Sequence, residues 1–355
     1  MKARGPRRLD PLLPGDPAEV GGYRLVGRVG SGGMGTVYAA TGDGLRGYLA
    51  VKVVHERHAG DGAFRRRFAA EARLLARVNS PCVARFAGAD VQAERPWLAT
   101  EFVPGPTLRR HVERHGRLRR GMLFALAVGC ADALRAVHAV DVVHRDLNPG
   151  NVVLSPAGPK LLDFGIAHRE TREDAVRWLR LRRYRRAVRD LRLPDPAPEG
   201  EERLPGPRDR LGTPGWISPE QYRGGGVTAA SDVFLWGALV AYAASARDPF
   251  GVAAPAELAR RAVREAPDVD RLPPALEGPV AAAMAKDPGD RPPAPELLGA
   301  LLSAGGADGA GRAEPPAGPT GRAAAVREVL RRDWTGVAVR PPKPPRRSRF
   351  HPPAG

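Results

Sequence analysis

A break at Pro104-Gly105-Pro106 separates two parts of the chain that differ in hydrophobic periodicity. Before the break, short apolar runs at residues 23–26, 36–39, 49–54 and 100–103 indicate strands, and residues 64–78 repeat at helical spacing. After it come two long, almost uninterrupted apolar stretches, residues 122–139 and 233–244, which predict helices buried in a core. This segregation favours an α+β fold with two lobes, one rich in β-strands with a single helix and one mainly helical.

Composition sets the expected boundaries of the folded part. Residues 1–22 are rich in Pro, Gly and Arg, and we expect them to be disordered. The folded domain is predicted to span residues 23–303, with a first lobe at 23–104 and a second at 105–303. Residues 304–355 are again rich in Pro, Gly and Arg and are predicted to be mostly disordered, with one helix over residues 322–334.

The charge and the cysteines narrow the kinds of partner and compartment. The chain has 355 residues and a formal net charge of +17, which favours anionic partners such as nucleotide phosphates, nucleic acid, anionic membranes or acidic proteins. A solvated arginine-rich surface explains the same charge equally well. Cys82 and Cys130 imply neither a disulfide framework nor a zinc site, and they suit a reducing cytoplasm. We find no signal peptide and no apolar run of about 18 residues, so we expect no membrane span and a cytoplasmic protein.

A glycine-rich turn joins the first two predicted strands. Residues 30–37 read GSGGMGTV, and glycine lets backbone N–H groups approach phosphate oxygens without an intervening Cβ. Because the turn joins strand to strand, it argues against a dinucleotide-binding fold. Lys52 stands alone in the next apolar strand, where it either faces outward or needs a partner. Glu71 on the following predicted helix can pair with Lys52 and aim its ammonium at nucleotide phosphates.

The most specific segment is residues 144–151, which read HRDLNPGN and are called the catalytic loop below. An Asp followed five residues later by an Asn, after a long apolar helix, can place both side chains at one site. Asp146 can then accept a hydroxyl proton, and Asn151 can ligate a metal. Asp163, in Asp163-Phe164-Gly165, supplies a second oxygen ligand after another strand. Two hard oxygen ligands plus phosphates are a common way to hold Mg²⁺.

In this order, the glycine-rich turn, the strand lysine, the helix glutamate, HRDxxxxN and DFG resemble the eukaryotic-like protein kinases, and the chain is similar to their bacterial serine/threonine members. Residues 212–214 (GTP) and 218–220 (SPE) resemble the family's segment between GTP and APE, with Ser for Ala. Residues 231–237 resemble the helix that anchors the catalytic loop. Arg291 matches the family's arginine that pairs with the glutamate of APE, here Glu220. The resemblance covers about residues 23–303.

The resemblance implies ATP-dependent, Mg²⁺- or Mn²⁺-dependent transfer of the γ-phosphate to protein Ser or Thr hydroxyls in cytoplasmic signalling. The backbone at Glu101 and Val103 is expected to bind adenine, and Thr100 occupies the gatekeeper position. The implied catalytic residues are Asp146, Lys52, Glu71, Asn148 and Thr213, and the implied metal ligands are Asn151 and Asp163. The implied ATP contacts are Val29, Gly30, Ser31, Gly32, Gly33, Gly35, Val37, Ala50, Lys52, Thr100, Glu101, Val103 and Val153.

One residue of the catalytic loop departs from the family. Asn148 stands where its serine/threonine members usually carry lysine, and asparagine brings no positive charge to the transition state, so we expect slower turnover. This residue is the support for an alternative, a pseudokinase scaffold. A second alternative is a kinase-fold phosphotransferase for small molecules. The segment from 212 to 220 argues against it, because the matching segment of protein kinases forms a platform for peptide substrates. A nucleic-acid-binding protein rests on charge alone and is not expected.

The stretch between Asp163 and Glu220 is longer than is usual in the family, with an insertion at about residues 168–211. Residues 174–192 are predicted to form a helix with an arginine-rich face, which is either a solvated face packed on the second lobe or a docking surface for an acidic partner. No Ser or Thr occurs between Thr171 and Thr213. In the family, an arginine at the position of Arg145 pairs with a phosphate on this segment. We therefore hypothesise that the chain is active without phosphorylation of this segment, and that Glu201, Glu202 or Asp209 supplies the negative charge instead.

Overall fold

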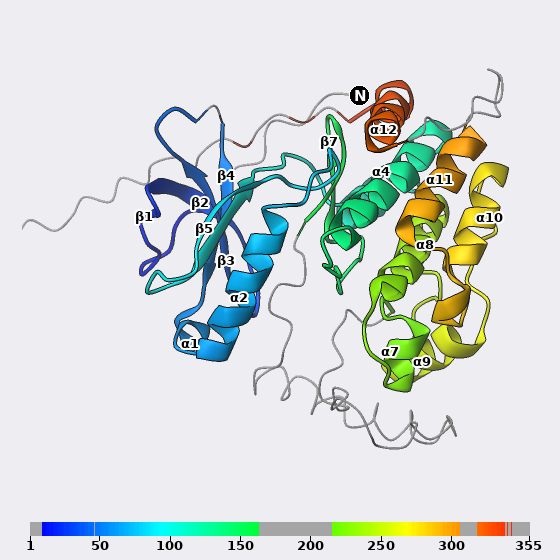
Figure 1. Cartoon of the computed structure of the whole chain (residues 1–355), viewed down its shortest axis with the longest axis horizontal. Helices are drawn as coiled ribbons and strands as arrows, with labels where there is room; N and C mark the ends of the chain where they lie inside the picture. The colour runs from blue at the N-terminus through cyan, green and yellow to red at the C-terminus, as the bar shows by residue number, and fades with distance from the viewer. Residues whose placement is uncertain are drawn as a thin grey trace, which may run out of the picture. The chain divides into compact units, whose positions relative to one another are not determined.

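The computed structural model describes residues 9–45, 47–162, 215–305 and 318–337, together with Val339 and Pro342. These residues form two compact units. The first unit holds the described residues up to 77 and residues 84–105, with Val339 and Pro342, and the second unit holds residues 78–83 and 106–337. The first is rich in strands and the second mainly helical, as the sequence predicted (Figure 1).

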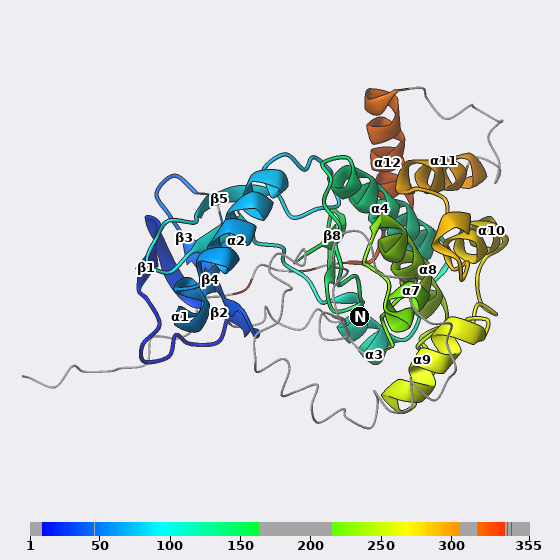
Figure 2. The ribbon, with the colours of Figure 1, turned by 60° about the horizontal axis from the view of Figure 1, so that its bottom comes forward.

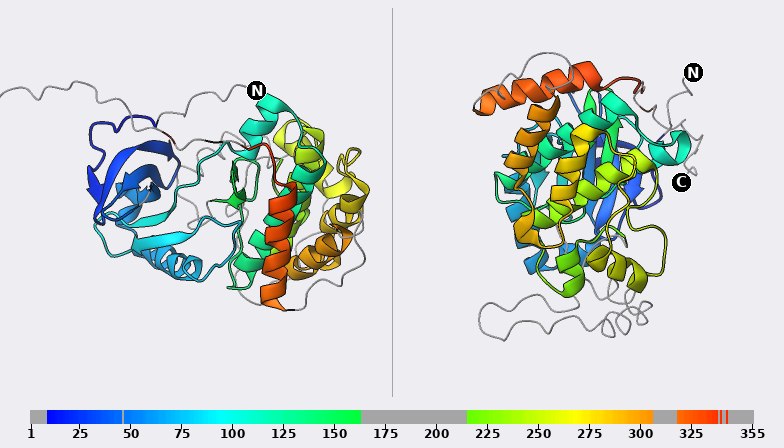
Figure 3. Two further views of the ribbon diagram at one scale, coloured as in Figure 1. Left: turned by 90° about the horizontal axis from the view of Figure 1, so that it is seen from above. Right: turned by 90° about the vertical axis from the view of Figure 1, so that its right-hand side faces the viewer.

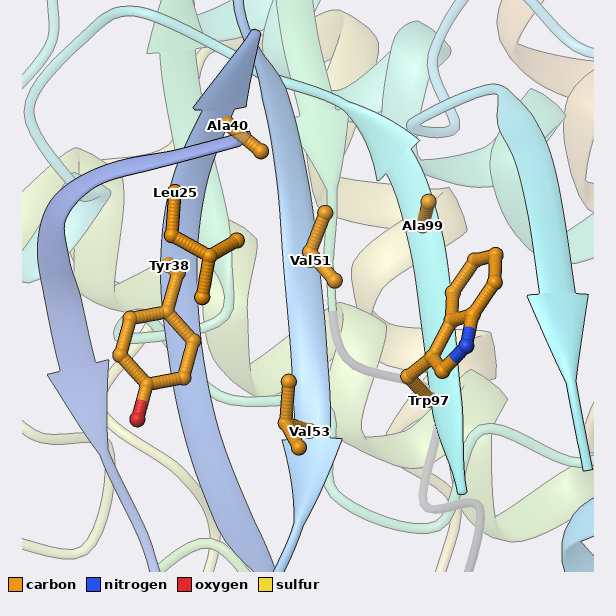
Figure 4. Packing of buried hydrophobic residues seen from close by; sticks show 7 residues of the cluster. All are labelled: Leu25, Tyr38, Ala40, Val51, Val53, Trp97 and Ala99. Atoms are coloured by element: carbon orange, nitrogen blue, oxygen red, sulfur yellow. The ribbon is translucent and has the colours of Figure 1, made fainter. Parts of the chain in front are cut away.

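The first unit is built on a six-stranded antiparallel sheet in the order β1-β2-β3-β4-β6-β5. Its strands are β1 (Glu19–Val20), β2 (Tyr23–Ser31), β3 (Gly35–Thr41), β4 (Leu49–Val54), β5 (Phe86–Asp90) and β6 (Trp97–Glu101). Alternate residues of the central strands form one buried apolar cluster (Figure 4), made of Leu25, Tyr38, Ala40, Val51, Val53, Trp97 and Ala99. The period of two in these strands therefore assigns one face of the sheet to this core.

Two helices accompany the sheet, the short α1 (Glu56–Ala59) and the longer α2 (Gly62–Leu75) (Figure 2). Asp61 caps α2, since its carboxylate accepts hydrogen bonds from the backbone N–H groups of Ala63 and Phe64. The buried side chains of α2 follow the helical spacing expected from the sequence: Phe64, Phe68, Ala72 and Leu75.

The second unit packs its helices around α4 (Arg120–His138) and α8 (Ala229–Ser245), the two apolar stretches of the sequence. A hairpin of β7 (Val152–Ser155) and β8 (Gly158–Leu161) lies against α4. Its other helices are α3 (Leu108–His115), α7 (Pro219–Arg223), α9 (Pro255–Arg264), α10 (Pro274–Ala283), the 3-10 helix η1 (Pro288–Asp290), α11 (Ala294–Gly305) and α12 (Pro319–Asp333).

Only α4, among the described helices, is long and apolar enough to cross a membrane. Most of its residues are buried against α8, α11, α12 and β8, which is the environment of a core helix. Trp236 of α8 fixes this packing, because its ring N–H donates to the carbonyl of Ala127 in α4 at 3.0 Å.

The predicted disorder of residues 1–22 is wrong for residues 9–22. Residues 9–22 follow the edge of the sheet: Asp10 exchanges backbone hydrogen bonds with Arg28, and Leu9 is buried. The backbone groups of this Pro/Gly-rich segment thus find partners on β2, which the local composition does not reveal. At the other end, the expected helix over residues 322–334 is confirmed by α12, which packs against α4 (Figure 3). The predicted insertion at 168–211 and its helix at 174–192 lie outside the described residues.

We predict that Tyr38→Phe loosens the N-terminal segment. The Tyr38 hydroxyl donates to the Asp16 carboxylate at 2.6 Å, and losing a hydrogen bond to a charged group costs about 2 kcal/mol of unfolding free energy. Urea unfolding followed by fluorescence measures this loss. Tyr23→Phe is the matched control, because the described residues offer the Tyr23 hydroxyl no hydrogen bond. Equal stability of the two variants would contradict the prediction.

Candidate active site

The backbone of the catalytic loop is held by one buried carboxylate. Asp232, in the first turn of α8, accepts the backbone N–H of His144 at 2.7 Å and that of Arg145 at 3.0 Å. The ring Nε2 of His138 donates to the same carboxylate at 2.8 Å. Arg145 has a φ of 68°, a left-handed conformation that costs energy for a residue with a Cβ and therefore needs such fixation.

The Asp146 carboxylate is oriented by two side-chain amides. Asn148 donates from Nδ2 to Asp146 Oδ1 at 3.0 Å, and Asn151 donates from Nδ2 to Oδ2 at 3.0 Å. Both amides also donate to the Asp146 carbonyl, and Asn148 Oδ1 accepts the backbone N–H of Gly150 at 2.8 Å. The structure thus brings Asp146 and Asn151 together, and adds Asn148 as a brace of the same carboxylate.

This arrangement suits a metal ligand at Asn151. Its Nδ2 group is committed to Asp146, and its Oδ1 accepts no hydrogen bond from the described residues. A neutral oxygen so placed is the kind of ligand that Mg²⁺ takes.

The hairpin β7–β8 connects the catalytic loop to the second predicted metal ligand. The backbone N–H of Leu162 donates to the Asn151 carbonyl at 2.9 Å, and the His144 ring donates from Nε2 to the Leu162 carbonyl at 3.0 Å. The next residue in sequence is Asp163, which lies outside the described residues. Val153, predicted to contact adenine, is buried in β7.

Four predicted ATP-binding residues share one face of the sheet in the first unit. Ala50 is paired with Thr100, and Lys52 is paired with Val37, in neighbouring strands. Strand alternation puts all four on the face opposite the apolar cluster of Figure 4. Lys52 is half-buried there.

The glycines of residues 30–35, the glycine-rich loop, are needed for two different reasons. A Cβ at Gly35 would lie 2.3 Å from the Val53 carbonyl oxygen, so the sheet itself requires this glycine. A Cβ at Gly30 or Gly32 would meet no atom of the described residues within 4 Å, so packing against that part of the chain does not require these glycines. Those two fit a ligand that approaches the backbone closely, as phosphate does. Ser31 hydrogen-bonds Thr36 across the loop at 3.1 Å, and Val29 is 40% exposed.

A feature that the sequence did not reveal fixes the glycine-rich loop. The ring of His55 donates from Nε2 to the Gly32 carbonyl at 3.1 Å, and Arg57 donates to the Gly33 carbonyl. Burial, with the nearby Arg57 charge, lowers the pKa of His55, so the neutral ring is favoured. These two carbonyls thus accept hydrogen bonds from the segment that opens α1, while the Gly32 N–H donates to the Gly35 carbonyl at 3.0 Å across the loop.

The remaining predicted residues stand as follows. Glu71 lies in α2, but the structure does not describe its side chain. Asp163 and Thr213 lie outside the described residues. Glu101 ends β6 and donates its backbone N–H to the Arg85 carbonyl at 2.8 Å, with Val103 two residues further on.

The predicted ion pair between Glu220 and Arg291 is present. Arg291 donates to both carboxylate oxygens, at 2.9 and 2.8 Å, and Ser231 donates to Oε1 at 2.6 Å. The Arg291 side chain is fully buried and also donates to the carbonyls of Ala230 and Ala285. Burial alone raises the pKa of Glu220, but the hydrogen bonds from Arg291 and Ser231 outweigh it and lower the pKa below the ordinary 4.5.

Comparison with known proteins points in one direction. The family model described as "Protein kinase domain" matches residues 23–302. The chain is 37% identical over 298 residues to the "Probable serine/threonine-protein kinase PkwA" of Thermomonospora curvata, which covers 82% of this chain and 35% of that protein. It is 35% identical over 310 residues to the serine/threonine-protein kinase AfsK of Streptomyces coelicolor, covering 86% and 35%. The chain therefore spans about a third of the length of these relatives. The solved PknI kinase domain of Mycobacterium tuberculosis shares the fold, with a TM-score of 0.55 and 24% identity over 81% of this chain and 97% of that one.

We predict that the Glu220–Arg291 pair makes stability depend on pH in acid. Because folding lowers the Glu220 pKa, the pair stabilises the fold fully above pH 4.5 and loses its effect as the pH falls through the folded pKa. Glu220→Gln should therefore be less stable than the wild type at pH 7, with a deficit that shrinks below pH 4.5. Melting temperatures from pH 7 to 3 test this, with exposed Glu277→Gln on α10 as control. A deficit independent of pH would show that Glu220 acts through shape alone.

Proposed function

Because the chain belongs to the protein kinase family, we propose that it is a serine/threonine protein kinase, which transfers the γ-phosphoryl group of ATP to serine or threonine hydroxyls of proteins. The observation that carries this proposal is the Asp146 carboxylate, which two amides orient inside a loop fixed by Asp232. A scaffold protein has no need of an acceptor held in this way. The names of PkwA, a probable serine/threonine-protein kinase, and of AfsK, a serine/threonine-protein kinase, support the choice of hydroxyl.

The residues supply a consistent mechanism. Asp146 accepts the proton of the substrate hydroxyl and orients its oxygen toward the phosphorus. Lys52 and the N–H groups of the glycine-rich loop stabilise phosphate charge, and Ala50, Val37, Thr100 and Val153 offer surfaces to the base. Asn151 and Asp163 would hold Mg²⁺, which, when bound, neutralises the phosphate oxygens. Glu220 and Arg291 fix the start of α7, directly after the segment to which Thr213 belongs.

The proposal extends to compartment and partners. Cys82 and Cys130 are free, buried thiols, and burial raises the pKa of Cys130 to about 12, which supports a reducing cytoplasm in which neither is used for chemistry. Protein substrates are proposed as partners. Docking of an acidic partner to the helix expected at 174–192 remains a hypothesis, because these residues lie outside the described part of the chain.

We predict that Asp146→Asn abolishes phosphate transfer. Losing a general base costs about 10²- to 10⁴-fold in rate, and the uncharged amide keeps the shape of the carboxylate. The measurement is transfer from labelled ATP with Mg²⁺ to the protein itself and to a generic basic protein, followed by phosphoamino-acid analysis.

The control is Asp141→Asn, the same change at an exposed aspartate close in sequence. Transfer by Asp146→Asn at the wild-type rate would remove the proposed base. Absence of transfer in the wild type, with ATP binding retained, would favour a scaffold or a small-molecule phosphotransferase, and phosphotyrosine would overturn the choice of hydroxyl.

We predict that Asn148→Lys raises kcat by about tenfold, because a cation beside Asp146 stabilises the charge that develops on the transferred group. Steady-state kinetics at saturating ATP measures this change. Asn148→Ala separates the charge from the brace: it should lower kcat, since the amide bonds to Asp146 and Gly150 are lost. A Lys variant as slow as the Ala variant would mean that the brace matters more than the charge.

A further inference from the structure

Helix α12 lies beyond the residues matched by the kinase family model, which end at 302, yet it is part of the second unit. One face of α12 is apolar and buried: Val326, Val329, Leu330 and, directly after the helix, Trp334. The other face carries exposed charged residues, among them the paired Glu328 and Arg331. The buried positions recur at steps of three and four, so this helix is held by packing rather than by its own propensity.

The buried end of α12 reaches the turn of hairpin β7–β8. The Trp334 ring N–H donates to the Ser155 carbonyl at 2.7 Å in a buried setting. Leu330 covers Gly158 so closely that a Cβ there would lie 3.3 Å from a Leu330 methyl carbon. Ser155 and Gly158 face each other across the hairpin, and the Ser155 hydroxyl donates to the Gly158 carbonyl at 2.7 Å. Both residues that close the turn are therefore touched by α12.

The opposite end of the same hairpin holds the active-site groups. β7 begins directly after Asn151, and β8 leads into Leu162, whose N–H binds the Asn151 carbonyl and whose carbonyl accepts from His144. Each strand of the hairpin has four residues. A shift at the turn is therefore passed directly to Asn151 and Val153.

Helix α12, which contacts the hairpin turn, is itself held by the buried helix α4. α12 packs along α4, and a Cβ at Gly121 in the first turn of α4 would lie 3.3 Å from the Asp333 side chain. Helix α12 packs on α4, and Leu330 and Trp334 at its end contact the hairpin. Close side-chain packing fixes the distance from α4 through α12 to the turn of hairpin β7–β8. The turn therefore has little freedom to move relative to α4.

We propose that Trp334 and Leu330 are positioning residues, which act through hairpin β7–β8 to hold Asn151 and Val153 for nucleotide binding and transfer. The proposal rests on the kinase function proposed above. The buried face of α12 would then position active-site residues, although the helix lies outside residues 23–302, which the family model matches.

The test uses the full-length chain with Trp334→Phe, which keeps an aromatic ring but removes the donor to Ser155, and Leu330→Ala. We expect Trp334→Phe to raise KM for ATP or lower kcat by about tenfold, because small displacements of reacting groups are costly. Hydrogen exchange should become faster at the Leu154 and Leu162 amides, whose hydrogen bonds fix β7 and its junction with the catalytic loop.

Two control variants separate positioning from stability. Arg327→Ala changes an exposed residue of α12 and should leave every readout unchanged. Leu298→Ala removes a fully buried side chain of α11, which also packs on α4, and should lower the melting temperature without changing KM or the exchange of residues 151–162.

If Trp334→Phe and Leu330→Ala lower the melting temperature with KM, kcat and exchange at wild-type values, or behave as Leu298→Ala does, α12 merely stabilises the fold and the proposal is overturned. If the wild type transfers no phosphate, the kinase proposal fails. In that case the exchange of residues 151–162 alone decides whether α12 positions the hairpin.

Discussion

The candidate active site depends on a buried carboxylate, Asp232, whose charge is compensated by three hydrogen-bond donors. Burying a charge is costly unless hydrogen bonds replace the lost water, and here two backbone N–H groups and the His138 ring do so. The same bonds hold Arg145 in a left-handed conformation and so turn the chain toward Asp146. Asp232 sits at the N-terminal end of α8, where the helix dipole also favours negative charge. The position of Asp146 thus rests on the core helix.

Much of this architecture could be predicted because the signals are local. The spacing of Asp146 and Asn151 correctly predicts that they meet. For Lys52 the sequence left two possibilities open, and the register of β4 places it on the face opposite the apolar core. Two motifs far apart in sequence, at Glu220 and Arg291, were paired through the resemblance, and the ion pair is present. In each case one short segment contains the signal that places the residues, or a family pattern links two distant segments.

The parts that were missed depend on contacts between segments with no shared pattern. Asp16 was placed in a disordered segment on composition, yet it binds Tyr38, 22 residues away, and Arg28. Trp334 binds the Ser155 carbonyl across 179 residues, and a backbone carbonyl has no sequence signature. Composition describes what a segment can do alone, whereas these segments are ordered by surfaces that other parts of the chain provide.

Asn148 shows why a departure from a family pattern has to be judged in its setting. From the sequence it is a lost charge, which weakens catalysis and favours a scaffold. In the structure its amide donates to the Asp146 carboxylate and carbonyl, and its oxygen accepts from Gly150. A lysine could supply the charge and a donor but could not accept the Gly150 N–H. If the chain is the kinase proposed above, asparagine exchanges electrostatic stabilisation of the transferred group for a more rigid base. The substitution is then a change in how catalysis is divided among residues and not evidence that catalysis is absent.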